Sequence, residues 1–117
     1  MVIFDSNPRI FMAKEPIDVR KGIDYLSSLV LNQFELNPYD KSLFIFSNKR
    51  HNRLKCLYFD GSGFWVFIKR VENGTLKWKH SADCACPEIS EQQLRWILEG
   101  LKPEQKRSIP SIHYEFS

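Results

Sequence analysis

The sequence predicts an α+β fold: an antiparallel β-meander of four or five strands packed by two α-helices. Three runs rich in aromatic and β-branched residues lie within Leu43–Val71, with turn residues between them, as in consecutive strands. Two stretches with apolar residues at helical spacing, near residues 18–35 and 90–100, flank this central part. We expect residues 1–102 to form a single α+β domain and residues 103–117 a C-terminal tail.

The three central strands are expected at residues 43–46, 53–60 and 64–71. Asp60-Gly61 predicts a tight turn between the last two, because both residues tolerate a positive φ. A basic tip at residues 49–53 connects the first two. Alternation along the second strand places Cys56 on one face and Lys55 and Leu57 on the other. The third strand has apolar residues on both faces, which favours a central strand that is covered on both sides or that presents aromatic residues to a partner.

Further strands are expected over residues 9–14 and, after the turn at Asn73-Gly74, over residues 75–80. The first helix is expected to open with Asp18 as its cap, and Gly22 indicates close packing near its start. The second helix has a capping-box pair, Ser90 and Gln93, and a left-handed C-terminal cap at Gly100. The residues expected to face the core are Ile23, Leu26, Val30 and Phe34 in the first helix, and Leu94, Ile97, Leu98 and Leu101 in the second.

Length and composition indicate an ordinary globular chain. It has 117 residues, of which 43% are hydrophobic and 26% are charged. No apolar run approaches the ~20 residues of a membrane span, and the N-terminus does not resemble a signal peptide, so we expect a cytoplasmic protein that does not enter a membrane. An odd number of cysteines, three, argues against a disulfide framework.

Positive charge is concentrated in one part of the chain. The segment from Lys41 to His80 holds nine Lys and Arg residues and two acidic residues, a formal charge of +7. Because the whole chain carries +3, the remainder carries −4. A basic surface within an acidic frame is typical of proteins that meet a polyanion. The alternative is that these cations only keep exposed strands soluble.

Two sets of residues on the predicted sheet are candidates for binding. The set for DNA consists of Lys49, Arg50, His51, Arg53, Lys55, Lys69 and Arg70. The set for a protein partner, or for stacking on bases, consists of Trp65, Phe67 and Trp78. Aromatic residues on strands more often belong to the core, which is the alternative for the second set.

Metal-binding and catalytic patterns are weak. His80, Cys84 and Cys86, with His113 as a distant fourth ligand, are a candidate zinc set, but Cys-x-Cys is not the usual spacing and we expect no cofactor. Cys56 is expected to be a small buried apolar residue. The acidic residues that a metal-dependent nuclease would need are scattered, and each has a local structural role: Asp18, Asp24, Asp60 and Glu72. We therefore expect neither an enzyme nor a small-molecule substrate.

Four stretches, taken together, resemble a known family. They are Asp18-Val-Arg-Lys-Gly-Ile-Asp24, Leu43-Phe-Ile-Phe-Ser-Asn-Lys-Arg50, Arg53-Leu-Lys-Cys-Leu-Tyr-Phe-Asp-Gly61 and Gly63-Phe-Trp-Val-Phe-Ile-Lys-Arg70. In this order they resemble the TnpB accessory proteins (Orf2-like family) of transposable elements of the insertion-sequence-66 type, over roughly residues 8–101. Phe59 stands where the family usually has Trp. The Cys-x-Cys segment and the residues after Gly100 are not part of the pattern.

The resemblance implies a bacterial protein encoded beside a separate transposase and a second accessory protein, and needed for efficient transposition. It implies no catalytic activity and no established active site. The positions that match the family motif are Asp18, Arg20, Lys21, Asp24, Asn48, Lys49, Arg50, Arg53, Lys55, Asp60, Gly61, Trp65, Lys69 and Arg70. We therefore expect a non-enzymatic factor that contacts DNA through the basic hairpin face. The alternative is an adaptor that binds the transposase or its companion through exposed aromatic residues.

Overall fold

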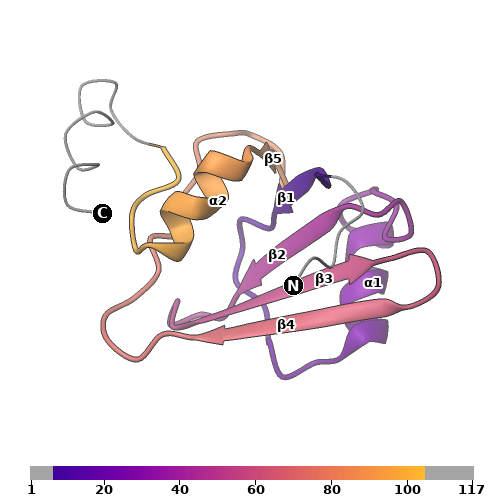
Figure 1. The fold of residues 1–117 in the computed structure, drawn as a ribbon, viewed down its shortest axis with the longest axis horizontal. Helices are drawn as coiled ribbons and strands as arrows, with labels where there is room; N and C mark the ends of the chain where they lie inside the picture. Colours follow the sequence, from indigo (N-terminus) through magenta and orange to yellow (C-terminus); the bar gives the residue numbers. More distant parts are fainter. Residues whose placement is uncertain (1–6, 105–117) are drawn as a thin grey trace.

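The computed structural model describes residues 7–104 of the chain. In chain order its elements are β1 (Ile10–Met12), α1 (Ile23–Asn32), β2 (Leu43–Ser47), β3 (Arg53–Phe59), β4 (Phe64–Arg70), β5 (Glu88–Ile89) and α2 (Glu91–Leu98). The five strands form one sheet in the order β4-β3-β2-β1-β5 (Figure 1). The α+β class is therefore confirmed.

The sheet is mixed, so the prediction of a purely antiparallel meander is wrong. β2, β3 and β4 are antiparallel neighbours, as expected. β1, however, pairs in parallel with β2 and antiparallel with β5. The reason lies in the connection between them, because β1 reaches β2 through helix α1. A long helical crossover allows neighbouring strands to run parallel, whereas a short turn does not.

The sheet separates two hydrophobic cores, and each is closed by one helix. On one face, Cys56 of β3 belongs to the same core as Ile97 of α2. On the other face, Leu57 of β3 shares a core with Leu26 and Val30 of α1. Figure 1 shows α1 behind strands β3 and β4. The alternation predicted for β3 is confirmed.

β4 is an edge strand and not the central strand that its apolar residues suggested. Its side chains are less buried than those of β3. Trp65 on one face and Ile68 on the other are both exposed. In this protein, the strand with apolar residues on both faces is therefore an edge strand, and its side chains are only partly buried.

Helix α1 begins later than predicted. Its N-cap is Gly22, which has no side chain to accept a hydrogen bond, and Asp18 pairs with Arg20 instead of capping the helix. A Cβ at Gly22 would meet no atom within 4 Å, so the expected close packing is absent among the described residues. Ile23 is exposed, and Leu26 and Val30 form the buried stripe.

Helix α2 agrees with the prediction at both ends. The Ser90 hydroxyl accepts a hydrogen bond from the Gln93 backbone N–H at 3.1 Å, and the Gln93 side chain accepts one from the Ser90 N–H at 2.8 Å. Gly100 has the expected left-handed conformation, with φ +83°. Ile97 is fully buried, but Leu98 is exposed, contrary to the expected stripe.

The segment over residues 75–80 is not a strand. Its Leu76 and Trp78 are buried, as the alternation suggested, but they pack on a sheet face and not within a ladder. The Leu76 backbone N–H donates to the His51 carbonyl at 2.7 Å. Residues 105–117, which include most of the expected tail, lie outside the described part, and the domain boundary at residue 102 stays a prediction.

The turn between β3 and β4 lies at Asp60-Gly61, as predicted, but of these two residues only Gly61 has the expected positive φ. Asp60 organises the turn through its side chain. Its carboxylate accepts hydrogen bonds from the backbone N–H groups of Ser62 and Gly63 at 2.8 and 2.9 Å, and from Trp65 Nε1 at 2.8 Å. These bonds, led by that from Ser62, hold the pKa of Asp60 well below its usual range. Gly61, at φ +106°, takes the turn position that other residues rarely occupy.

We expect Asp60→Asn to destabilise the fold at neutral pH and to have little effect in strong acid. The folded-state pKa lies below the unfolded value of about 3.9, so the charge stabilises the fold above that value. This contribution is lost as the pH falls through the folded-state pKa. Urea unfolding of both proteins between about pH 2 and pH 7 measures the difference. A difference that does not change with pH would contradict the assignment.

Candidate nucleic-acid interface

The turn between β2 and β3 is fixed by its own side chains. Asn48 Oδ1 accepts hydrogen bonds from the backbone N–H groups of Asn52 and Arg53, each at 3.0 Å. Asn48 Nδ2 donates to Asn52 Oδ1 at 2.6 Å. This arrangement leaves Lys49 and Arg50 exposed at the tip. A basic tip with a defined backbone can present its charges without first becoming ordered.

His51 connects the turn to neighbouring parts of the chain through its side chain and its backbone. It has a positive φ of 55°, and its Nδ1 lies 2.9 Å from the Ser47 hydroxyl. Its carbonyl accepts the hydrogen bond from Leu76. The structure therefore places His51, one of the seven residues expected to contact DNA, in a half-buried position that connects the turn to the segment after β4.

Beside this turn, the surface forms a hollow of about 630 Å³. Its lining comes from the loop before α1, from the β2–β3 turn and from the start of β3. The residues are Ile17, Asp18, Val19, Arg20, Asn48, Lys49, Arg50 and Arg53. We call this the basic hollow, because four of these side chains are cationic and only one is acidic.

Three cations of the basic hollow have no acidic partner in the described part of the chain. Within residues 7–104, no carboxylate forms an ion pair with Lys49, Arg50 or Arg53. All three residues are exposed. They come from the predicted DNA-binding set, and the fold brings them together on one side of the molecule.

The fourth cation, Arg20, was not in the predicted binding set. Its Nε and Nη2 donate to the two carboxylate oxygens of Asp18, each at 2.9 Å, and its backbone N–H donates to Asp18 Oδ1 at 3.1 Å. The side-chain hydrogen bonds from Arg20 are the main reason that the pKa of Asp18 falls to about 2. The sequence signal for Arg20 was its place in the family motif.

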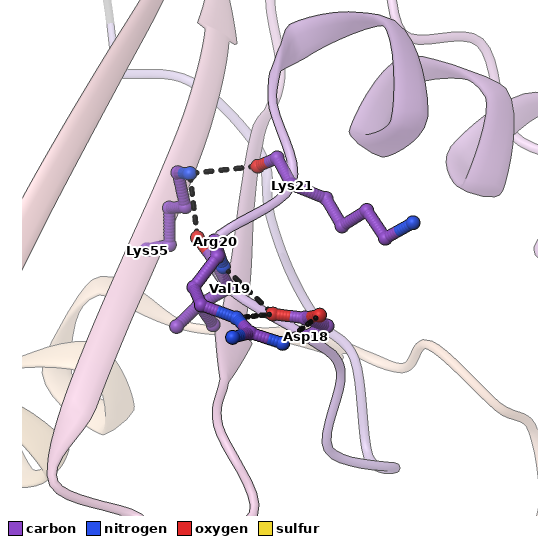
Figure 2. A network of polar contacts seen from close by, with 5 residues as sticks. All are labelled: Asp18, Val19, Arg20, Lys21 and Lys55. Carbon is purple, nitrogen blue, oxygen red and sulfur yellow. Dashed lines mark hydrogen bonds and ion pairs between the residues drawn. The ribbon is translucent and has the colours of Figure 1, made fainter.

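Lys55 does not lie on the surface with the other basic residues. It is buried, with 7% of its surface exposed. Its Nζ donates to the carbonyl oxygens of Val19 and Lys21 at 2.7 and 2.8 Å (Figure 2). The structure thus connects this ammonium group to the loop before α1, which does not fit the expectation of a DNA contact.

Lys69 and Arg70, at the end of β4, are not among the residues that line the basic hollow. Arg70 lies opposite Arg53 in the sheet but pairs with Glu72, with Nε and Oε2 at 2.8 Å. Lys69 is on the other face of the sheet, where its Nζ donates to the Leu98 carbonyl at 3.0 Å. The seven candidate residues therefore do not form a single surface.

The three candidate aromatic residues do not form a single surface either, because Trp65 is exposed and Trp78 is buried. Trp65, 42% exposed, stacks on Phe67 with ring centroids 6.1 Å apart and planes at 4°. Trp78 is only 8% exposed, and its Nε1 donates to the Ala13 carbonyl at 2.8 Å. Its ring belongs to the core and is not available to a partner.

The candidate zinc ligands do not gather into a site in the described part of the chain. No group of three His, Cys, Asp or Glu residues within residues 7–104 is placed to hold a metal ion. His80 Nδ1 accepts a hydrogen bond from the Ala82 backbone N–H at 3.0 Å. Burial raises the pKa of both Cys86 and Cys56 to about 12. His113 lies outside the described residues.

Neither described helix has the length and apolar character that a membrane crossing requires. This finding covers residues 7–104.

The comparisons with known proteins identify a family. The profile of the family described as IS66 Orf2 like protein matches residues 8–108. Two proteins of Sinorhizobium fredii, both described as uncharacterized, are similar: y4hO is 35% identical over 96 residues, 82% of this chain and 83% of its own length. The second, y4jC, is 34% identical over 93 residues, 80% of this chain and 79% of its own length. No solved structure matches. The chain belongs to the IS66 Orf2-like family, whose members are accessory proteins of IS66-type transposition.

Proposed function

We propose that this protein is a non-enzymatic accessory factor that contacts the DNA backbone through Lys49, Arg50 and Arg53 of the basic hollow. The observation that carries the proposal is their placement: three exposed cations without carboxylate partners among residues 7–104, on one turn held by the Asn48 hydrogen bonds and on the strand that follows it. Arginine and lysine side chains are among the groups through which proteins contact the phosphate oxygens of DNA. The family supplies the context in which the polyanion is DNA.

The contact set is narrower than the sequence suggested. Lys55 and Lys69 are left out, because the first is buried and the second lies on the opposite face of the sheet. Arg70 is left out because it is not among the residues that line the basic hollow and because Glu72 pairs with it. The proposal therefore concerns one side of the molecule, formed by the β2–β3 turn and the loop before α1.

Titration of duplex DNA with the protein at several salt concentrations tests this proposal. The affinity is expected to fall as salt rises, because each phosphate contact releases counterions and contributes about −0.9 to the slope of log affinity against log salt. These three contacts alone predict a slope of about −2.7, and each further phosphate contact of the basic hollow would make it steeper by about 0.9. Absence of binding at low salt would refute the DNA contact while leaving the family membership intact.

A second function is an adaptor that binds the transposase or the second accessory protein. The stacked Trp65–Phe67 pair favours it, because an exposed indole is a common anchor in protein interfaces. Co-purification with either protein that is lost on Trp65→Ala, and kept on Arg50→Ala/Arg53→Ala, would support the adaptor. The reverse pattern would support contact through DNA.

A further inference from the structure

The most unusual charged group of the described chain is the Lys55 ammonium. A buried ammonium is costly unless its donors are satisfied. Here two carbonyl oxygens accept from it, and they are the carbonyls of Val19 and Lys21, on the two sides of Arg20. Lys55 is thereby connected to the backbone immediately before and after one residue of the basic hollow (Figure 2).

The Arg20 side chain is fixed as well as its backbone. The Asp18 carboxylate accepts hydrogen bonds from Nε and Nη2 of the Arg20 guanidinium. These two bonds fix the orientation of the guanidinium plane. A guanidinium has five N–H donors, so three remain after these two bonds. Among residues 7–104 no hydrogen bond is made by Nη1, and the side chain lines the basic hollow with Arg53. In Figure 2 the Lys21 side chain points away from this group.

We propose that Arg20 is a further phosphate-contacting residue of the basic hollow and that Lys55 is its positioning residue. This inference rests on the proposed function, since the ligand is the phosphodiester backbone of DNA. Lys55 does not touch the DNA. It acts by holding the loop at residues 18–21 against β3, so that the free edge of the guanidinium faces the same space as Lys49 and Arg50.

A double-mutant cycle separates this role from a direct contact. Arg20→Ala is expected to lower the magnitude of the salt slope by about 1, as the loss of one phosphate contact should. Lys55→Met is expected to lower it by the same amount, although the ammonium is buried. The double variant should lose no more than either single variant, because both changes remove the same contact. In contrast, Lys55→Met combined with Arg50→Ala should lose about 2.

Trypsin gives a readout that does not depend on DNA. Cleavage after Arg20 and Lys21 requires the loop to open locally, and the two Lys55 hydrogen bonds oppose that opening. Lys55→Met should be cut there faster than the wild type under native conditions, whereas cleavage after Lys77 should be unchanged. If Lys55→Met does not fold, Lys55→Gln, which keeps a donor in the buried position, should show the same change to a smaller degree.

Two results would overturn the inference. One is that the changes in salt slope caused by Lys55→Met and Arg20→Ala add up in the double variant, which would mean that each substitution removes a separate contact. The other is a loop that resists trypsin equally in the wild type and the Lys55 variants. Failure of the wild type to bind DNA would instead remove the proposed function, and the trypsin comparison would still report whether Lys55 positions the loop.

Discussion

Replacement of Trp78 by alanine is expected to lower the free energy of unfolding by about 3–5 kcal/mol, the usual cost of removing a large buried aromatic side chain. The Trp78 ring belongs to the core between the sheet and α2, and its indole N–H donates a hydrogen bond to the Ala13 carbonyl. The thermal midpoint should fall by something on the order of 10–20 °C. Urea or thermal unfolding followed by circular dichroism measures the change.

Trp65→Ala is the matched control for this prediction. Trp65 is exposed and contributes one hydrogen bond to Asp60 and one ring contact to Phe67, so its loss should cost about 1 kcal/mol. The two tryptophans thus have opposite roles, one in stability and one at the surface. Equal losses of stability for the two variants would contradict the assignment of Trp78 to the core.

The charge-neutralising variant Arg50→Ala/Arg53→Ala is expected to weaken DNA binding strongly and to lower the magnitude of the salt slope by about 2. Both side chains are exposed on the basic hollow and lack carboxylate partners within residues 7–104. Their removal should therefore leave the free energy of unfolding within about 0.5 kcal/mol of the wild-type value. Fluorescence anisotropy of labelled duplex DNA at several salt concentrations measures the slope.

Lys77→Ala/Lys79→Ala provides the control, because it removes the same number of charges from exposed positions in the segment after β4. This variant should bind DNA nearly as the wild type does. If the two double variants weaken binding equally, the interaction depends on net charge and not on the basic hollow.

Elements encoded by local chemistry could be predicted from the sequence. The capping box of α2 involves residues three apart, and the Asp60 turn is completed within four residues, so neither needs knowledge of the tertiary fold. The face alternation of β3 followed in the same way from strand geometry. The parallel pairing of β1 with β2 depends on contacts between distant segments, and a three-residue strand carries no signal of direction.

The candidate site was predicted only in part, for a related reason. The cluster of positive charges in the sequence indicated Lys49, Arg50 and Arg53. Sequence alone does not distinguish an exposed lysine from Lys55, because the hydrogen-bond partners that bury Lys55 lie more than thirty residues earlier in the chain. Likewise, alternation in a strand does not say which face will be covered, and Trp78 and Trp65 look alike in sequence. Position in the fold, and not residue type, decides which of these groups meets a partner.

The most direct test is to map DNA binding on the ¹⁵N-labelled protein by amide chemical shifts. Duplex DNA at low salt should shift the amides of residues 17–20 and 48–53 most strongly, and these shifts should become smaller as salt is added. Amides of residues 75–80 should change little. Shifts centred on residues 75–80 or on the Trp65–Phe67 pair, or no shifts at all, would contradict the proposed DNA contact.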